Sequence, residues 1–177
     1  MCKLKISFQL FVLFSIVSVS QSCKNNTPLP DVLIIGGGTS GVSAGIASAR
    51  MGVQTMIIEE SEWLGGMLTS AGVSAVDGNY RLPGGFWGEL KDSLISYYGS
   101  TEALKTGWVS NVLFEPSVGN KILQQIVSKE KDLKIHFKSR LKSIVKEKDQ
   151  WIVTIETPEK TVVLYPKIVI DATELGD

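Results

Sequence analysis

The chain has 177 residues, and its 18 lysines and arginines balance 18 aspartates and glutamates, so the formal net charge is zero. This balance argues against the strongly basic surface that binds nucleic acids or acidic lipids. With 44% hydrophobic residues the chain can bury one modest core, and its two cysteines exclude a disulfide-rich scaffold.

Residues 1–22 have the pattern of a secretory signal peptide, in which two early lysines precede a largely apolar stretch and small polar residues. The apolar core is shorter than the roughly 20 residues that a membrane-spanning helix needs, although an uncleaved N-terminal anchor is the alternative. Both interpretations predict that the rest of the chain is exported.

Cys23 follows Ser20-Gln21-Ser22, and this segment resembles the lipobox of bacterial lipoproteins. It departs from the usual pattern because Ser20 takes the place of leucine and Gln21 is larger than usual. The resemblance predicts lipidation at Cys23 and a periplasmic or outer-membrane-anchored lipoprotein. An ordinary cleaved signal with an incidental cysteine is the alternative. Residues 23–30 are polar, contain two prolines and are predicted to be a linker.

Residues 31–60 contain the strongest pattern in the chain. An apolar run over 32–35 has the length of a strand, and the segment from Gly36 to Gly41 that follows fits G-x-G-x-x-G. A helix of small residues is predicted over 42–51, and a second apolar run ends at Glu59. A strand, glycine turn, helix, strand and acid within one βαβ unit indicate a dinucleotide-binding site.

Each part of this pattern has a physical role. Gly36 permits a sharp turn out of the strand, and Gly38 lets the backbone approach a pyrophosphate. Gly41 and Gly45 allow the helix to pack close to the sheet, with its first N–H groups facing the phosphates. A carboxylate at Glu59 would accept hydrogen bonds from ribose hydroxyls and disfavour a 2′-phosphate, which argues against NADP.

The middle of the chain predicts two helices, over 86–98 and 115–128, and a strand over 133–137. This strand contains His136, the only histidine, for which a structural role is expected over a catalytic one. Alternating apolar and polar residues over 141–146, 151–157 and 161–165 predict a three-stranded antiparallel meander. The apolar run over 168–170 predicts a parallel strand buried on both faces.

A second glycine pair, Gly65-Gly66, comes soon after Glu59 and is followed by Met67. A plain turn is one interpretation of this pair. Together with Glu59 and the extra Gly45, however, the segment resembles the N-terminal half of FAD-dependent oxidoreductases with a glutathione-reductase type of FAD domain. The likeness is greatest to an exported bacterial branch and extends over residues 31–177.

The resemblance implies an α/β fold, namely a Rossmann-like FAD/NAD(P)-binding domain with a parallel sheet and a three-stranded antiparallel β-meander, incomplete at its C-terminus. It also implies FAD as the cofactor. In the family an Ala-Thr-Gly turn packs against the adenosine, and here Glu174 replaces that glycine, as is common in the exported branch. The predicted cofactor-binding residues are Gly36, Gly38, Thr39, Ser40, Gly41, Glu59, Glu60, Gly65, Gly66, Met67, Leu141 (through its backbone), Ala172 and Thr173.

The resulting hypothesis is an FAD-dependent oxidoreductase acting on an unidentified small molecule, for which a sugar-derived compound is one candidate. Because the sequence stops just after the Ala-Thr turn, we expect the N-terminal fragment of a longer enzyme, inactive alone, with its catalytic residues unassigned. No metal site or nucleic-acid partner is predicted. The alternatives are an NAD-dependent dehydrogenase and a non-catalytic or inactive dinucleotide-binding fragment.

Overall fold

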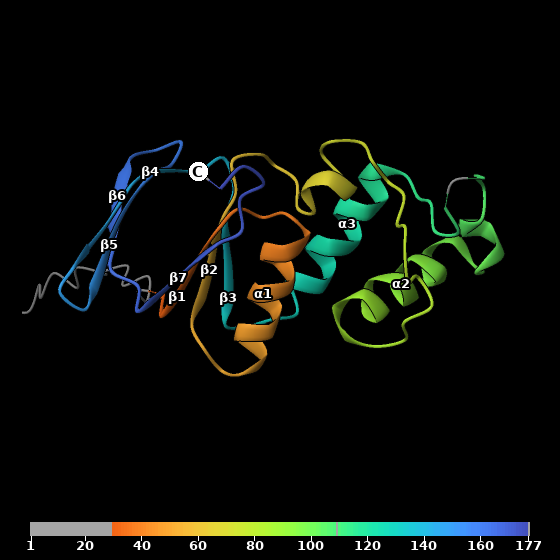
Figure 1. Cartoon of the computed structure of the whole chain (residues 1–177), viewed down its shortest axis with the longest axis horizontal. Helices are drawn as coiled ribbons and strands as arrows, with labels where there is room; N and C mark the ends of the chain where they lie inside the picture. Colours follow the sequence, from red (N-terminus) through yellow and green to blue (C-terminus); the bar gives the residue numbers. More distant parts are fainter. Residues whose placement is uncertain (1–29, 109, 177) are drawn as a thin grey trace, which may run out of the picture.

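The computed structural model describes residues 30–108 and 110–176 (Figure 1). The predicted signal peptide, the lipidation site Cys23 and all of the predicted linker except Pro30 lie outside the described residues. In chain order the elements are β1 (Val32–Ile35), α1 (Thr39–Arg50), β2 (Thr55–Ile58), the 3-10 turn η1 (Gly66–Leu68), α2 (Gly85–Tyr98), the 3-10 turn η2 (Glu102–Leu104), α3 (Pro116–Val127), β3 (Leu133–His136), β4 (Arg140–Glu147), β5 (Gln150–Glu156), β6 (Thr161–Leu164) and β7 (Ile168–Asp171).

Four strands form a parallel sheet in the order β3-β2-β1-β7. In its centre Val32 of β1 is in register with Thr55 of β2 on one side and Ile168 of β7 on the other. Both β1 and β2 are buried along their whole length, as expected for apolar strands covered on two faces. The remaining strands form an antiparallel sheet in the order β4-β5-β6, so the predicted parallel sheet and meander are both confirmed.

The parallel sheet lies between a layer of helices and the antiparallel meander (Figure 1). Side chains alternate along each strand, so that Ile34 and Ile57 belong to the core shared with the helices. Leu33 and Met56 point the other way, into a second core to which the meander contributes Val153 and other apolar residues. The parallel sheet therefore contributes to two cores, one shared with the helices and one shared with the meander.

The helices are placed by small and apolar residues on their inner faces. A Cβ built on Gly45 of α1 would lie 2.7 Å from Cδ1 of Ile57, so the predicted close approach of this helix to the sheet is confirmed. Helix α2 ends where Gly99 adopts a left-handed conformation and donates its N–H to Ile95 O at 2.8 Å. In the part of the chain that the structure describes, no helix is long and apolar enough to cross a membrane.

Strand β7 is less buried than its composition predicts. Ile168 is 54% exposed, and Val169 and Ile170 are only partly buried, so the predicted burial on both faces is wrong. The reason is positional, because within the described residues β7 pairs with β1 alone and its other edge is open.

Candidate functional site

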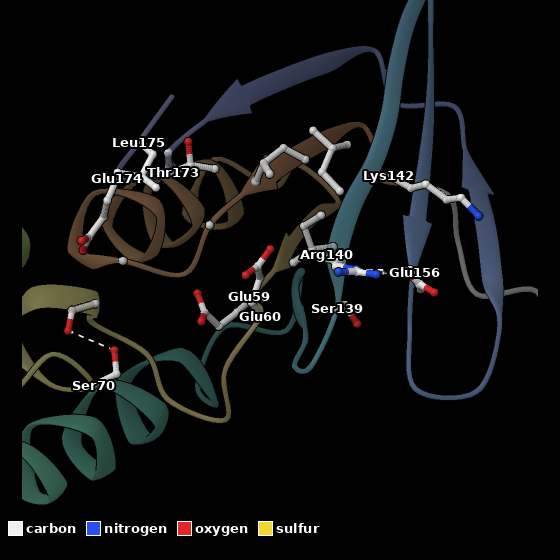
Figure 2. Close-up of a pocket in the computed structure, with 17 residues that line it drawn as sticks. Glu59, Glu60, Ser70, Ser139, Arg140, Lys142, Glu156, Thr173, Glu174 and Leu175 are labelled. Carbon is white, nitrogen blue, oxygen red and sulfur yellow. Dashed lines mark hydrogen bonds and ion pairs between the residues drawn. The ribbon is translucent and has the colours of Figure 1, made fainter. Parts of the chain in front are cut away.

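A cleft of about 1040 Å³ opens at the carboxyl ends of the parallel strands, beside the start of the meander (Figure 2). Ile35 at the end of β1, Ile58 at the end of β2 and Ala172 just after β7 line it. Open α/β sheets bind their ligands at this place, where the first strand leads into a helix N-terminus. The topology therefore brings the predicted glycine turn, acid and Ala-Thr segment to one cleft.

The glycine turn between β1 and α1 packs so closely against neighbouring backbone that two of its glycines leave no space for a Cβ. Gly36 has a φ of +98°, and a Cβ there would lie 2.6 Å from the Ala172 carbonyl oxygen. A Cβ on Gly41 would overlap the Gly36 carbonyl oxygen. Gly38 is different, since the nearest atom to a Cβ on it would be Glu174 Oε1 at 3.9 Å. Gly38 thus presents open backbone to the cleft.

The second glycine pair lies directly against this turn. The Gly65 N–H donates to Gly37 O at 2.9 Å, and the Thr39 hydroxyl donates to Gly65 O at 2.9 Å. Gly65 and Gly66 both have positive φ, of 105° and 52°, which glycine adopts without strain. The two glycine segments therefore form one continuous layer of backbone beside the start of α1.

Glu59 links the end of β2 to the glycine turn. Its Oε2 accepts a hydrogen bond from the Gly37 N–H at 2.7 Å, and its Oε1 accepts one from the Ser61 N–H at 2.8 Å. Each carboxylate oxygen has a second lone pair, so Glu59 can still accept hydrogen bonds from a ligand. Figure 2 shows Glu59 and the neighbouring Glu60 between the glycine turn and β4, and both line the cleft.

The opposite wall comes from the start of the meander. Ser139 is buried and donates its N–H to Glu59 O at 2.9 Å, which fixes where β4 begins. The Arg140 Nε and Nη2 atoms donate to Glu156 Oε2 at 2.9 and 2.7 Å. This hydrogen-bonded pair raises the pKa of Arg140 and lowers that of Glu156. Lys142 adds a second exposed cation to this wall.

The segment after β7 closes the cleft. Ala172 donates its N–H to Ile35 O at 2.8 Å, and Asp171 accepts hydrogen bonds from both the Thr173 N–H and hydroxyl. These two bonds hold the turn and lower the pKa of Asp171. Beyond the turn, Oε1 of the exposed Glu174 accepts a hydrogen bond from the Met67 N–H at 3.2 Å.

The structure places the predicted cofactor-binding residues in two groups. Those that line the cleft are Gly36, Gly38, Glu59, Glu60, Gly66, Leu141, Ala172 and Thr173. Those that lie next to it, in the helix start and the second glycine loop, are Thr39, Ser40, Gly41, Gly65 and Met67. His136, on β3, does not line the cleft; burial and the positive charge of Lys134 lower its pKa.

The sequence interpretation missed several lining residues, which are Ile35, Ile58, Ser70, Ser139, Arg140, Lys142, Glu156, Glu174 and Leu175. Turn length alone does not bring Arg140 and Glu156 together. The connection at Lys148-Asp149 sets the register near the turn, and an irregularity between Leu141 and Ser143 then shifts it so that Arg140 pairs with Glu156. Within the described ranges, no group of three or more histidine, cysteine, aspartate or glutamate side chains could hold a metal ion.

Comparison with protein families gives a match over residues 31–177 to the family described as FAD dependent oxidoreductase. Among curated proteins, the carotenoid phi-ring synthase of Chlorobaculum tepidum is 28% identical over 109 residues. That alignment covers 58% of this chain and 16% of the relative. The chain therefore spans a small part of the curated relative that it matches.

Solved structures share the fold. A flavoprotein/dehydrogenase from Cytophaga hutchinsonii superimposes with a TM-score of 0.60 and 16% identity, covering 83% of this chain and 40% of that one. The ornithine N-hydroxylase of Kutzneria sp. 744, solved with reduced FAD, NADP+ and L-ornithine, superimposes with a TM-score of 0.55 and 18% identity. Here the superposition covers 81% of this chain and 37% of the hydroxylase.

Proposed function

Since the chain belongs to the FAD-dependent oxidoreductase family, we propose that its cleft binds FAD and that the protein is a flavoprotein oxidoreductase. One observation carries the proposal. The open backbone of Gly38 and the carboxylate of Glu59 face the same cleft, at the ends of adjacent strands. A dinucleotide needs this pairing, because its pyrophosphate approaches the glycine while its ribose reaches the acid.

The phosphate end of the cleft fits a pyrophosphate. The first turn of α1 contains Thr39, Ser40 and Gly41, whose N–H groups have no partner within the helix and lie at the positive end of its dipole. With no Cβ on Gly38 or Gly66, the backbone there can approach the phosphates closely. Gly65, Gly66 and Met67 would run beside the cofactor.

The adenosine end fits as well. Glu59 would accept hydrogen bonds from the ribose, with Glu60 beside it. The backbone of Leu141 would hold the adenine, and Ala172 and Thr173 would pack against the adenosine. The volume of about 1040 Å³ lies just above the range of most small-molecule pockets, roughly 300–1,000 Å³, and so leaves room for a ligand as large as a dinucleotide.

Bound FAD would supply hydride or electron transfer, and the residues of this chain would bind and orient it. We assign no catalytic residue among these residues. The substrate is proposed to be a small molecule, with a sugar-derived compound as one candidate. The chain spans between 16% and 40% of the relatives named above, so the activity of the whole protein belongs to this proposal.

Export and a lipid anchor at Cys23 also remain proposals, supported by the sequence pattern of residues 1–22 and the segment that follows. Fractionation of cells that produce the protein or its Cys23→Ser variant tests them. We expect the unchanged protein in the membrane fraction and the variant released from it. Equal amounts of both in the membrane would argue against lipidation.

The function is tested by purifying the full-length protein and recording its visible absorption spectrum. We expect the bands of oxidised flavin, and release of the cofactor by heat should yield FAD. A colourless protein that binds NAD saturably would instead indicate a dehydrogenase of the nicotinamide class. Bound flavin that no candidate donor reduces would indicate a non-catalytic binding protein.

A further inference from the structure

The carboxylate of Glu174 lies within the backbone layer formed by the two glycine segments. Its Oε1 accepts the Met67 N–H at 3.2 Å. The same oxygen would be 2.5 Å from a Cβ on Gly66 and 3.9 Å from one on Gly38. Figure 2 shows the side chain reaching from the segment after β7 to the start of α1. An anionic oxygen thus already lies between the two glycines.

The surroundings of this oxygen are those that a phosphate oxygen seeks. A backbone N–H points at it, the N-terminus of α1 is adjacent, and neighbouring glycines leave the backbone accessible. Helix N-termini and exposed N–H groups bind carboxylates and phosphates for the same electrostatic reason. A carboxylate and a phosphate would therefore use the same place.

We propose that Glu174 lowers the affinity of the cofactor site for phosphate-bearing ligands, because its carboxylate competes with the dinucleotide pyrophosphate for the Met67 N–H and the space between Gly38 and Gly66. This inference rests on the proposed FAD site. Entry of the pyrophosphate requires the Glu174 side chain to turn away, so the ligand must bind strongly enough to displace it.

Glu174 is held less firmly than Glu59, another acid that lines the cleft. Glu59 is partly buried and accepts two short backbone hydrogen bonds, at 2.7 and 2.8 Å. Glu174 is exposed and accepts one longer hydrogen bond, from Met67. Its turn also contains Gly176 at a φ of +71°. Glu59 is thus held as part of the wall, whereas Glu174 can rotate into solvent.

The competition should lower the affinity of every phosphate-bearing ligand by a similar factor, so its consequence depends on how tightly each ligand binds. A dinucleotide binds at both ends of the cleft and can offset the loss of the Glu174 contact, whereas free phosphate or a mononucleotide makes fewer contacts. Glu174 should therefore weaken the binding of every ligand that places a phosphate at this point, and it should not affect adenosine. This behaviour would keep the site from being filled by small anions.

The test measures binding of FAD and ADP to the full-length protein, stripped of flavin, by fluorescence titration and stopped-flow mixing. Glu174→Gln removes the charge but keeps the length, and Glu174→Asp keeps the charge but shortens the side chain away from Met67. We expect Glu174→Asp, which cannot reach the Met67 N–H, to bind FAD and ADP about two- to tenfold more tightly, the range for one ordinary hydrogen bond. Glu174→Gln should gain less, because its amide oxygen can still accept the Met67 N–H. The gain should appear in the association rate, with adenosine affinity unchanged.

Simple charge repulsion in the complex would give a different result. In that case Glu174→Asp would behave as the unchanged protein, and Glu174→Gln would slow dissociation instead of speeding association. This outcome, or equal FAD affinity in all three proteins, would overturn the competition. Failure of the unchanged protein to bind either FAD or ADP would overturn the proposed FAD site itself, so the two failures are distinguishable.

Discussion

The two sides of the cleft are built in opposite ways. On the glycine side, backbone meets backbone so closely that Gly36 and Gly41 have no space for a Cβ. On the meander side, the cleft is lined by long side chains, among them the exposed Arg140 and Lys142 and the partly exposed Glu156. One wall is fixed by the main chain, and the other is formed by groups that can move.

Because the two walls are built differently, substitutions on them should change stability and ligand binding to different degrees. A change on the glycine side should act on the fold first and on binding second, because the same atoms form the core of the βαβ unit and the phosphate site. A change on the meander side should leave the fold intact, since exposed ion pairs contribute little to stability. Four substitutions test this difference between the two walls.

The largest effect is expected for Gly41→Ala. The added methyl group would overlap the Gly36 carbonyl oxygen, a backbone atom that cannot move without disturbing the turn, so unfolding free energy should fall by about 3 kcal/mol. Urea denaturation measures this change in unfolding free energy. Gly84→Ala is the matched control, because a Cβ there would meet no atom within 4 Å. Similar losses in both variants would contradict the packing argument.

Glu59→Ala should come next. It removes the acceptor of two backbone N–H groups as well as the expected ribose contact. The unfolding free energy should therefore fall by about 1–3 kcal/mol, and FAD should bind less tightly by a similar amount. Denaturation and flavin-fluorescence titration give the two values. Glu62→Ala removes an exposed charge that does not line the cleft and serves as control. If it weakened FAD binding equally, Glu59 would act only through its charge.

Gly38→Ala tests the role of the glycine side in phosphate binding apart from its role in the fold. The φ of −61° suits alanine and the nearest atom is 3.9 Å away, so stability should fall by less than about 1 kcal/mol, the range for a poorer N-cap. The new methyl group would narrow the phosphate site, and FAD affinity should fall about tenfold. Thermal unfolding and titration of the same sample test both parts, and unchanged affinity would remove Gly38 from the phosphate site.

The smallest effect is expected for Arg140→Ala. The guanidinium and its partner Glu156 are exposed, so the midpoint of thermal unfolding should not change measurably. The pKa of Glu156, which the hydrogen bond from Arg140 lowers, should rise toward its ordinary value. Carboxyl chemical shifts followed by NMR over acidic pH would detect the rise. A large loss of stability would show that this wall is less adaptable than proposed.

The sequence is informative where structure is determined locally. The βαβ unit follows from two apolar runs and glycine spacing, and the structure contains it as predicted. The predicted start of the first helix, at residue 42, is too late, since α1 begins at Thr39. Thr39 and Ser40 continue a glycine-rich segment and resemble a loop in sequence. The exposure of β7 was missed for a different reason, since burial depends on which strands lie beside it.

The candidate site also contains some residues that the local sequence predicts and others that it does not. Glycines such as Gly36 stand out because few other residues adopt their conformation. Arg140 and Glu156 come together only through the register of the β4–β5 hairpin, which composition does not encode. Glu174 was recognised as a departure from the family turn, but its hydrogen bond to the Met67 N–H joins segments far apart in the sequence. Pattern analysis along the chain has no access to such contacts.

The pairing of β1 with β7 has a consequence for how the protein is made. Val32 lies beside Ile168, and the turn at Gly36 packs against Ala172, so the cleft needs segments synthesised far apart in time. Contacts between distant parts of a chain form slowly, because a long loop must close first. The emerging chain can therefore fold its first βαβ unit early, but the cleft described here forms only when β7 docks beside β1.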